Sequence, residues 1–451
     1  MSDISSNKHM KAINRALSSG SLGQLRHLLN QLPASDVAHL LESSPPRERN
    51  LLWQLLNDEH GTEVLQYLGE EIRGEFLKDL SADQLMVLVE DMEFDDLADL
   101  LQELPEQITQ QVLSALDEQN RERLEAVLSY PEDTAGGLMN TDVITVRPEI
   151  TLGVVQRYLR FHGAIPDATD NLLVVNRKNQ FIGILPLSRV LVFDGGATVR
   201  EAMITDIEPI PVDMSDHDVA NIFERRDFVS APVVDEHGVL VGRITIDDVV
   251  DVIRYEADHS ILSMAGLDED EDTFGSVWHT LRHRAVWLGI NLLTALAASA
   301  VIGLFQDTID QVVALAVLMP IVASMGGIAG SQTLTLVIRA LALGQVKADN
   351  TRYLLMKELS VGALNGIIWA SLIGVAAGLW FQDARIGIVL GVAMIINLII
   401  AAGAGAVLPM LLKRAGIDPA LAGGVVLTTI TDVVGFFAFL GLATVLFMSL
   451  L

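Results

Sequence analysis

The chain has 451 residues, is 50% hydrophobic, carries a formal net charge of −28 at pH 7 and contains no cysteine. Residues 285–451 hold seven basic and seven acidic residues, so the excess negative charge lies in residues 1–284. This balance excludes a nucleic-acid partner, which needs a basic face. The lack of cysteine excludes disulfides, thiol nucleophiles and Cys-ligated metals. The polar N-terminus lacks a signal-peptide core, so the acidic part is expected in the cytoplasm.

Residues 1–133 are predicted to be helical, because leucine recurs at helical spacing. An internal repeat supports this prediction: SDVAHLLESSP (35–45) matches DDLADLLQELP (95–105), with Leu40 opposite Leu100 and Leu41 opposite Leu101. The segment LSADQLMVLVEDM (80–92) is a looser third copy. Repeated helix–turn–helix units stack on one another, which predicts an acidic all-α superhelical domain.

Asp95 and Asp99 in this domain are one helical turn apart, so both carboxylates are expected on one face. Like charges at this spacing are mildly unfavourable without a cation. Two interpretations remain open: a cation site, or a solvated acidic face with Asp95 as a helix N-cap.

Residues 134–256 alternate short strands and helices, which predicts an α/β domain. NLLVV (171–175) and FIGIL (181–185) flank a polar turn, and APVVD (231–235) and VLVGRITIDDVVDVI (239–253) repeat that design. The halves 138–200 and 203–256 resemble a tandem CBS pair, a module that often binds adenine nucleotides. The second half keeps the Thr and Asp of the pattern in residues 242–247, whereas the first, in 183–187, lacks them. ATP binding is therefore indicated by one half only.

Residues 257–284 form a bridge that is charged and then amphipathic, and we expect a connecting helix there. An acidic run from Asp268 to Asp272 within the bridge is interpreted as a solvated loop.

Residues 285–451 are predicted to be a membrane domain with five helices, since about 20 apolar residues cross a bilayer. We place the spans at about 285–305, 312–338, 359–381, 386–412 and 421–450. Basic residues gather before the first span and in the second and fourth connections, as the positive-inside rule requires. This predicts a multi-pass protein of the plasma (inner) membrane with a cytoplasmic N-terminus and an external C-terminus.

Asp432 is the sole charged residue between Leu421 and Leu451. A carboxylate at mid-span costs several kcal/mol unless it faces a partner, water or an ion, so it is by default a functional-site hypothesis. The alternative is an Asp satisfied by the hydroxyls of Thr428, Thr429 or Thr431.

Small residues in 325–333, 401–409 and 421–424 permit close helix contacts and locally broken helices. Pro320 and Pro409 are expected to kink their spans. Ser331 and Gln332 within the second span could either line an ion path or make helix–helix contacts. The same two interpretations apply to Asn291, Asn365 and Asn397, for which helix–helix contacts are favoured.

The predicted path suits a hard divalent cation. One carboxylate with hydroxyls and carbonyls favours Mg²⁺ or Ca²⁺ over soft metals, and no basic residue lies at mid-span to serve an anion. Mg²⁺ sheds water reluctantly, so we expect it as the hydrate with Asp432 as an outer-shell acceptor. A symmetric dimer with Asp432 near its axis would supply two carboxylates.

The whole chain resembles the MgtE-type magnesium channel family. The resemblance rests on Tyr130–Met139 (YPEDTAGGLM), on Gly326-Gly327 and Gly330-Ser331-Gln332, on Ile338–Leu341, and on Asp418-Pro419-Ala420 with Asp432. Ile328 departs from the family pattern, which usually has Asn after the paired glycines.

The resemblance implies a homodimeric channel in the lipid bilayer that moves Mg²⁺ into the cytosol and is closed by intracellular Mg²⁺. It implies that the connecting helix is a plug, and that Asp432 and the backbone carbonyl of Thr428 hold the hydrated ion. The regulatory ligands that it implies are Glu63, Asp95, Asp99, Asp227, Asp247, Asp248, Asp251, Glu256, Asp258 and Asp418.

Two other functions remain open on the sequence. One is a secondary transporter that couples divalent cations to protons through Asp432. The other is a membrane-anchored nucleotide sensor, which would not need a carboxylate at mid-span. An enzyme is not indicated, because the sequence lacks a nucleophile–base pair, a phosphate loop and a catalytic metal motif.

Overall fold

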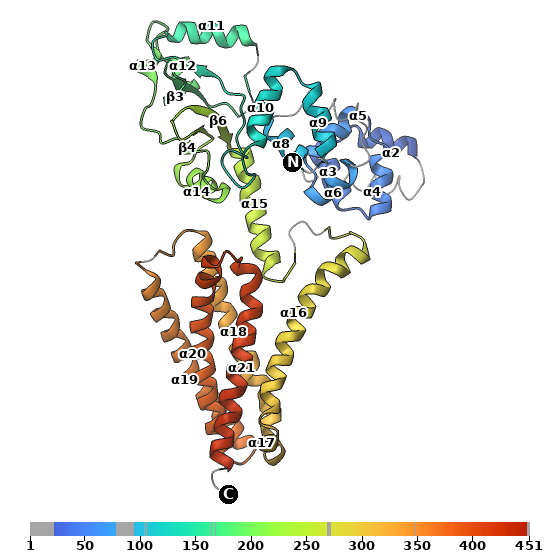
Figure 1. Ribbon diagram of the computed structural model, residues 1–451, viewed down its shortest axis with the longest axis vertical. Helices are drawn as coiled ribbons and strands as arrows, with labels where there is room; N and C mark the ends of the chain where they lie inside the picture. The colour runs from blue at the N-terminus through green and yellow to red at the C-terminus, as the bar shows by residue number, and fades with distance from the viewer. Residues whose placement is uncertain are drawn as a thin grey trace. The chain divides into compact units, whose positions relative to one another are not determined.

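The structure is a computed structural model (Figure 1). It describes residues 22–77, 94–102, 104, 106–163, 165–166, 168–267, 272–347 and 349–448. The chain forms two compact units: the first comprises residues 1–257 and 270–276, and the second comprises residues 258–269 and 277–451. The predicted third repeat, 80–92, and most of the acidic run 268–272 lie outside the described residues.

The first unit begins with short helices around one leucine-rich core (Figure 1). Asn57 and Asp117 cap α5 and α10 by accepting hydrogen bonds from the N–H groups of His60 and Asn120. Pro45 and Pro46 stand at the start of α4, where a missing N–H costs nothing. The helices are α2 (Leu22–Leu29), α3 (Ala34–Glu42), α4 (Pro46–Trp53), α5 (Asp58–Gln66), α6 (Glu70–Leu77), α8 (Phe94–Gln102), α9 (Glu106–Ala115) and α10 (Glu118–Leu128).

The predicted internal repeat corresponds to two equivalent helices, α3 and α8. The matched leucines Leu40, Leu41, Leu100 and Leu101 are at most 3% exposed and belong to the same core. The repeated sequence therefore produces the same amphipathic helix twice, as expected from its periodicity.

The rest of the first unit is a pair of matching α/β halves, which confirms the predicted CBS fold. In each half the first strand pairs parallel with the second, and the second pairs antiparallel with the third. The register shifts at the same place, Val174/Val175 and Val233/Val234. The first half has β1 (Thr145–Val146), α11 (Leu152–His162), β2 (Asn171–Val175), β3 (Phe181–Pro186), α12 (Leu187–Val192) and α13 (Val199–Ala202). The second has β4 (Ile210–Pro211), α14 (Asp216–Arg226), β5 (Ser230–Val234), β6 (Leu240–Thr245) and α15 (Ile246–Ser263).

The YPEDTAGGLM segment packs on the second half, although it precedes the first in sequence. The N–H groups of Ala135 and Gly136 donate to the carbonyls of Met214 and Val212. Met139 is buried in the core of the second half, where a Cβ on Gly242 would lie 2.9 Å from its Cγ. The glycine thus makes room for the incoming segment.

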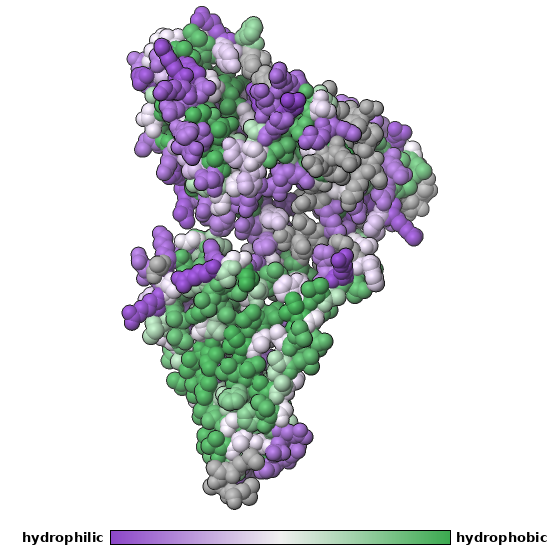
Figure 2. Space-filling view, viewed as in Figure 1, coloured by the Kyte–Doolittle hydropathy of each residue, from purple (hydrophilic) through white to green (hydrophobic). Residues whose placement is uncertain are grey.

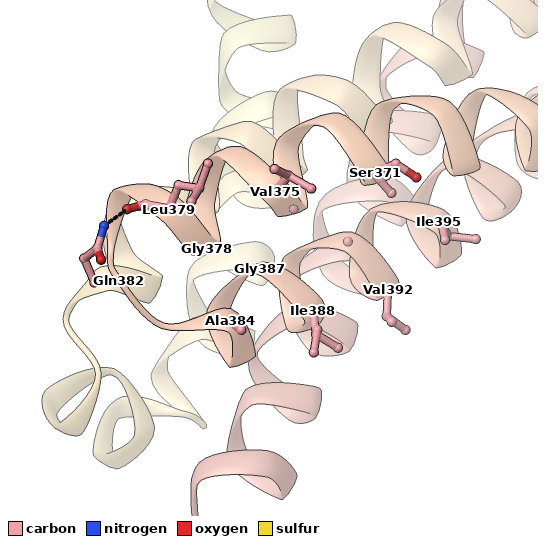
Figure 3. A pocket seen from close by; sticks show the side chains of 13 residues that line it. Ser371, Val375, Gly378, Leu379, Gln382, Ala384, Gly387, Ile388, Val392 and Ile395 are labelled. Atoms are coloured by element: carbon pink, nitrogen blue, oxygen red, sulfur yellow. Dashed lines mark hydrogen bonds between the residues drawn. The ribbon is translucent and has the colours of Figure 1, made fainter.

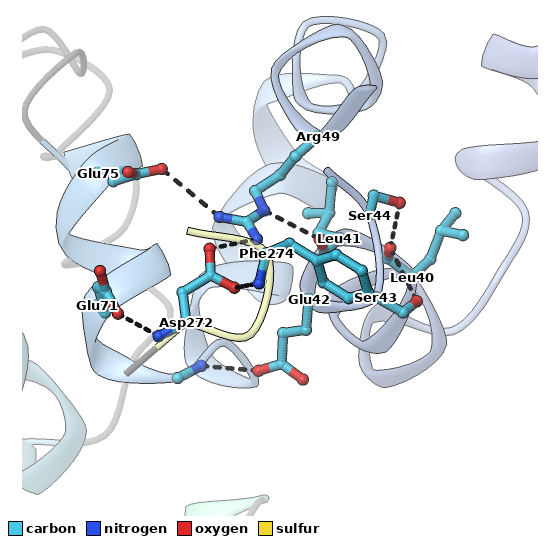
Figure 4. A network of polar contacts seen from close by, with 11 residues as sticks. Leu40, Leu41, Glu42, Ser43, Ser44, Arg49, Glu71, Glu75, Asp272 and Phe274 are labelled. Atoms are coloured by element: carbon cyan, nitrogen blue, oxygen red, sulfur yellow. Dashed lines mark hydrogen bonds and ion pairs between the residues drawn. The ribbon is translucent and has the colours of Figure 1, made fainter. Parts of the chain in front are cut away.

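Asp272 corrects the prediction of a solvated loop. Its side chain is 5% exposed, and its Oδ2 lies 2.7 Å from Nη2 of Arg49, which is 1% exposed (Figure 4). Arg49 also donates from Nε to the carbonyl of Leu41, and the N–H of Asp272 donates to Glu71. This acidic residue is therefore held in the helical part of the first unit because a buried cation meets it there.

The second unit contains five helices long and apolar enough to cross a membrane, as predicted, and Figure 2 shows the apolar surface over them. The glycine-rich segments of α18 and α20 are unbroken, so the local breaks that the small residues permit do not occur there; Pro320 and Pro409 are accommodated within helices. The elements are α16 (Val277–Gly303), the short α17 (Gln306–Gln311), α18 (Ala314–Ala342), α19 (Thr351–Trp380), α20 (Ala384–Arg414) and α21 (Pro419–Met448).

Glycines let α19 and α20 cross in backbone contact. A Cβ on Gly374 would lie 2.8 Å from the carbonyl oxygen of Gly387, and one on Gly387 would collide with that of Gly374. Beside this crossing is a groove of about 700 Å³ (Figure 3). Ser371 and Gln382 are its polar lining residues, and no ionisable side chain from the described part of the chain lines it, so these residues offer a cation no ligand charge.

Candidate ion pathway and acidic recess

A pocket of about 760 Å³ lies between α18 and α21, and we call it the Asp432 pocket. The α18 residues that line it recur at helical spacing, so they form one face of that helix. Ser331 and Gln332 lie on this face and are exposed, so of the two interpretations left open for them the lining of a path fits better within the single chain. The full lining is Ala323, Ser324, Gly327, Ile328, Ser331, Gln332, Thr335, Thr428 and Asp432.

The carboxylate of Asp432 is not satisfied by the neighbouring threonines. Thr428, Thr429 and Thr431 donate their hydroxyl hydrogens to the carbonyls of Gly424, Val425 and Thr428. Among the described residues, no donor or cation contacts Asp432, which faces the pocket half-buried. The alternative in which threonine hydroxyls satisfy Asp432 is therefore not observed.

The resemblance implies that the backbone carbonyl of Thr428 holds the hydrated ion, but this carbonyl is already bonded within the helix. It lies in a regular helix, where the N–H of Asp432 points at it, and the hydroxyl of Thr431 also donates to it at 3.0 Å. Both acceptor positions are thus used inside the helix. The Thr428 hydroxyl oxygen, which is exposed in the pocket, retains acceptor capacity.

A second candidate site lies in the first unit. A cavity of about 430 Å³ is lined by carboxylates from α8, the YPEDTAGGLM segment, α14 and α15, and we call it the acidic recess. Among the described residues, Arg73 of α6 is the cation that lines it. The recess contains Asp96, Asp99, Glu132, Asp133, Asp216, Asp248 and Asp251.

The recess makes negative charge costly. Desolvation raises the pKa of Asp99 to about 7; Arg73 opposes this shift, and Glu132 and Asp96 add to it. Desolvation likewise raises the pKa of Asp248 to about 7, against a hydrogen bond from Thr245 at 2.8 Å. The pKa values of Asp96, Asp216 and Asp251 are also raised, in each case chiefly by desolvation. A bound cation would relieve these costs.

The structure brings three predicted ligands, Asp99, Asp248 and Asp251, to the recess. Asp247 is exposed and near enough to raise the pKa of Asp248. Within the described residues, no three His, Asp or Glu side chains converge closely enough to hold one ion, so direct coordination would need movement or bridging water.

The remaining predicted ligands lie elsewhere. Glu63 on α5 pairs with His60 at 3.2 Å, and Asp227 is an exposed cap of α14. Glu256 lies 3.5 Å from His217, and Asp258 is exposed. The side chain of Asp95 lies outside the described residues.

Asp418 begins α21 and faces a histidine of α15. It accepts hydrogen bonds from the N–H groups of Ala420 and Leu421, both at 2.9 Å. Its Oδ2 also lies 3.4 Å from Nε2 of His259. The residue is thus a helix cap whose second contact joins α15 to α21 within the second unit.

Sequence reasoning missed Asp96 and Asp216. Asp96 is three residues before Asp99, a spacing that also puts two side chains on one face, so the available signal equalled that for Asp95. Asp216 stands between Ser215 and His217 in the first turn of α14. Its recess neighbours come from distant segments, which no local pattern reveals.

Comparison with known proteins matches almost the whole chain. A family model described as a divalent cation transporter, MgtE, matches residues 319–442; the MgtE intracellular N domain matches 32–133, and CBS domains match 135–195 and 199–255. The magnesium transporter MgtE of Thermus thermophilus is 33% identical over 445 residues, covering 96% of this chain and 98% of that protein. The magnesium transporter MgtE of Bacillus subtilis is 28% identical and covers 96% of each chain.

A crystal structure of the cytosolic domain of the Mg²⁺ channel MgtE in complex with ATP is also similar, with 33% identity and a TM-score of 0.48 over 53% of this chain and 98% of that one. Five apolar helices joined to a helical domain and a CBS pair define a multi-pass membrane transporter of divalent cations, not an enzyme. The chain belongs to the MgtE family, whose curated relatives are named magnesium transporters.

Proposed function

We propose that this protein is a Mg²⁺ channel whose ion crosses the membrane through the Asp432 pocket. The observation that carries the proposal is the face of α18 with Ser331 and Gln332, which meets the Asp432 carboxylate of α21, a group without a partner among the described residues. Oxygen ligands without a thiol or imidazole suit a hard cation. Asp432 and the Thr428 hydroxyl would accept hydrogen bonds from the water shell that Mg²⁺ retains.

The active form is proposed to be a homodimer in which two Asp432 pockets face one another. In a single chain Ser331, Gln332 and Thr428 are exposed on the flank of the bundle, where contact with lipid would be unfavourable. A twofold axis along this flank would cover them and place two carboxylates in one pathway. Because the chain has no cysteine, T428C supplies a single thiol. Oxidation should then link two copies of T428C but not two copies of the exposed control S299C. If T428C links no better than S299C, this interface is rejected.

The N-terminal unit and the loops that carry most basic residues are proposed to be cytosolic, with the C-terminus outside the inner membrane. An inward gradient and an inside-negative potential would then drive Mg²⁺ into the cytosol. Protease added to inverted vesicles should remove the N-terminal unit, and added to right-side-out vesicles it should not.

Gating is proposed to use the acidic recess and the surrounding predicted ligands. Mg²⁺ would neutralise the recess carboxylates and favour a compact state of the first unit, which we equate with the closed channel. The closed state must bind Mg²⁺ more tightly, since equal affinity shifts no equilibrium. Limited proteolysis of the full chain should slow as Mg²⁺ rises, and equal cleavage with and without Mg²⁺ would reject the mechanism.

Proton-coupled transport through Asp432 is the second candidate, because the carboxylate has no partner among the described residues. Liposomes loaded with a Mg²⁺ indicator separate the two functions. Channel flux should follow the Mg²⁺ gradient and the membrane potential with pH equal on both sides. Uptake that requires a pH gradient, or that moves protons in fixed ratio, would favour the coupled transporter.

We propose that ATP regulates the protein by binding to the second half of the CBS pair, the half that keeps the Thr and Asp of the pattern. Thr245, the Thr of the CBS pattern in the second half, donates to Asp248, which lies in the acidic recess. Calorimetry of ATP with the full chain should therefore give one site per chain, weakened by T245A. Two equal sites, or none, would contradict this assignment.

A further inference from the structure

Asn397 of α20 lies behind the Asp432 pocket and does not line it. It is 1% exposed, and its Nδ2 donates to the carbonyl of Val322 on α18 at 2.9 Å. Its Oδ1 is buried without a hydrogen-bond partner in the described part of the chain. An unpaired buried amide oxygen is costly, so stability alone does not explain the choice of Asn here.

Two glycines from the two pocket helices enclose this amide. A Cβ on Gly326 of α18 would lie 2.9 Å from Cγ of Asn397, and a Cβ on Gly435 of α21 would lie 2.7 Å from its Nδ2. The side chain therefore occupies the space where α18 and α21 both lack a Cβ. No residue larger than glycine fits at either position while Asn397 stays in place.

This contact is at the level of the pocket. Gly326 precedes Gly327 and Ile328, which line the pocket, and Gly435 is one turn after Asp432. Deeper along the same crossing, a Cβ on Gly330 would lie 2.9 Å from Leu427, and one on Gly423 would lie 3.1 Å from Leu334. The two helices run antiparallel in one register, and Asn397 is the polar contact in that register.

The hydrogen bond has a mechanical role because of Pro320. Proline has no N–H, so the helical bond to the carbonyl of Ala316 is missing and α18 can bend at that turn. Val322 is two residues further on. An amide that holds its carbonyl fixes the part of α18 that carries the pocket residues.

We propose that Asn397 is a positioning residue for cation selection: through Val322 and the two glycines it sets the distance between Asp432 and the polar face of α18. The inference rests on the proposed passage of ions through the Asp432 pocket. Ca²⁺ exchanges its water ligands for protein oxygens in flexible geometries, whereas Mg²⁺ keeps its water shell. A pocket of fixed width accepts the intact shell of Mg²⁺, and a looser pocket discriminates less.

The test compares N397L with the parent in liposomes, where Mg²⁺ and Ca²⁺ flux are measured separately and normalised to folded protein. Leucine keeps the number and branching of the heavy atoms and removes the amide, although its two methyl groups are bulkier. We expect the Mg²⁺-to-Ca²⁺ flux ratio to fall by about threefold or more, the factor that corresponds to one interhelical hydrogen bond. The matched control is N291L: Asn291 is exposed on α16 and donates to Trp287 of its own helix, so its ratio should stay at the parental value.

A merely structural Asn397 would lower both fluxes in proportion and leave the ratio unchanged, which would overturn the proposal. If N397L does not fold, the double variant G326A/N397A fills the vacated space with a methyl group and still lacks the hydrogen bond. Its ratio should remain low, and a parental ratio would show that packing alone sets the pocket. D432N tests the pathway separately, and unchanged Mg²⁺ flux in D432N rejects the proposed pathway. If D432N loses flux but N397L keeps the parental ratio, only the role of Asn397 is rejected.

Discussion

Arg49 and Asp272, 223 residues apart, form a buried ion pair with an Nη2–Oδ2 distance of 2.7 Å (Figure 4). Asp272 belongs to the segment that leads into α16, the first membrane helix. The pair therefore ties the chain just before its first span to the leucine-rich core of the N-terminal helices.

Breaking this ion pair should destabilise the first unit. D272N removes the buried carboxylate and leaves Arg49 only the half-exposed Glu75, whose Oε2 lies 3.6 Å from its Nη1. This change is expected to lower the free energy of unfolding of the first unit by about 3 kcal/mol. Hydrogen exchange of residues 272–276 in the full chain measures the release of the segment. The control is R226Q, because Arg226 and Glu208 form an exposed pair at 2.9 Å that contributes at most about 1 kcal/mol. Equal exchange in D272N and the parent would contradict a structural role for the pair.

The acidic recess should give a definite pH dependence. The pKa values of Asp99 and Asp248 are raised from 3.8 to about 7 in the folded protein. Between those values the folded state keeps protons that the unfolded state has lost, so stability falls as pH rises from about 4 to 7 and is lowest above pH 7. Without Mg²⁺, D99N should therefore raise the melting temperature at pH 8 and leave it nearly unchanged at pH 3.5. A lower melting temperature for D99N at pH 8 would contradict the pKa assignment.

Cation binding at the recess should show the opposite dependence. Mg²⁺ requires the deprotonated carboxylates, so its affinity should rise from pH 6 to pH 8. Calorimetry of the full chain at both values measures this change. In the double variant D99N/D248N the rise should be much smaller, and an undiminished rise would assign regulatory binding to other residues.

The crossing of α19 and α20 predicts a difference between two glycines in the same contact. A Cβ on Gly387 would collide with the carbonyl of Gly374, whereas a Cβ on Gly378 would meet its nearest atoms at 3.7 Å. G387A should destabilise the membrane unit by about 1–3 kcal/mol, because the backbones must separate. G378A should be near neutral. Thermal unfolding in detergent measures both, and equal melting temperatures would show that the helices are not in backbone contact.

The sequence predicted the helices and strands better than the tertiary contacts between them. The leucine repeat predicted α3 and α8 because periodicity is a local signal, and uninterrupted hydropathy predicted the five spans. The helix ends differ: α19 begins at Thr351, eight residues before the predicted span, because the polar first turns continue the helix beyond the apolar run.

Tertiary sites were less predictable. The pocket face of α18 follows helical spacing and could have been derived from the sequence, which left open whether Ser331 and Gln332 line a path or make helix contacts. Asp272 was assigned to solvent because its partner Arg49 is distant in the chain. The recess takes its carboxylates from four separate segments, so Asp96 and Asp216 could be found only once the helices were packed together.

Magnesium flux into liposomes by the parent and by D432N tests the central claim most directly. Removing the charge while keeping the shape of the side chain should lower flux by roughly tenfold or more, since about 1.4 kcal/mol of lost stabilisation gives one factor of ten. D310N, at an exposed carboxylate of α17, should conduct like the parent. Parental Mg²⁺ flux in a folded D432N protein would contradict the proposed pathway.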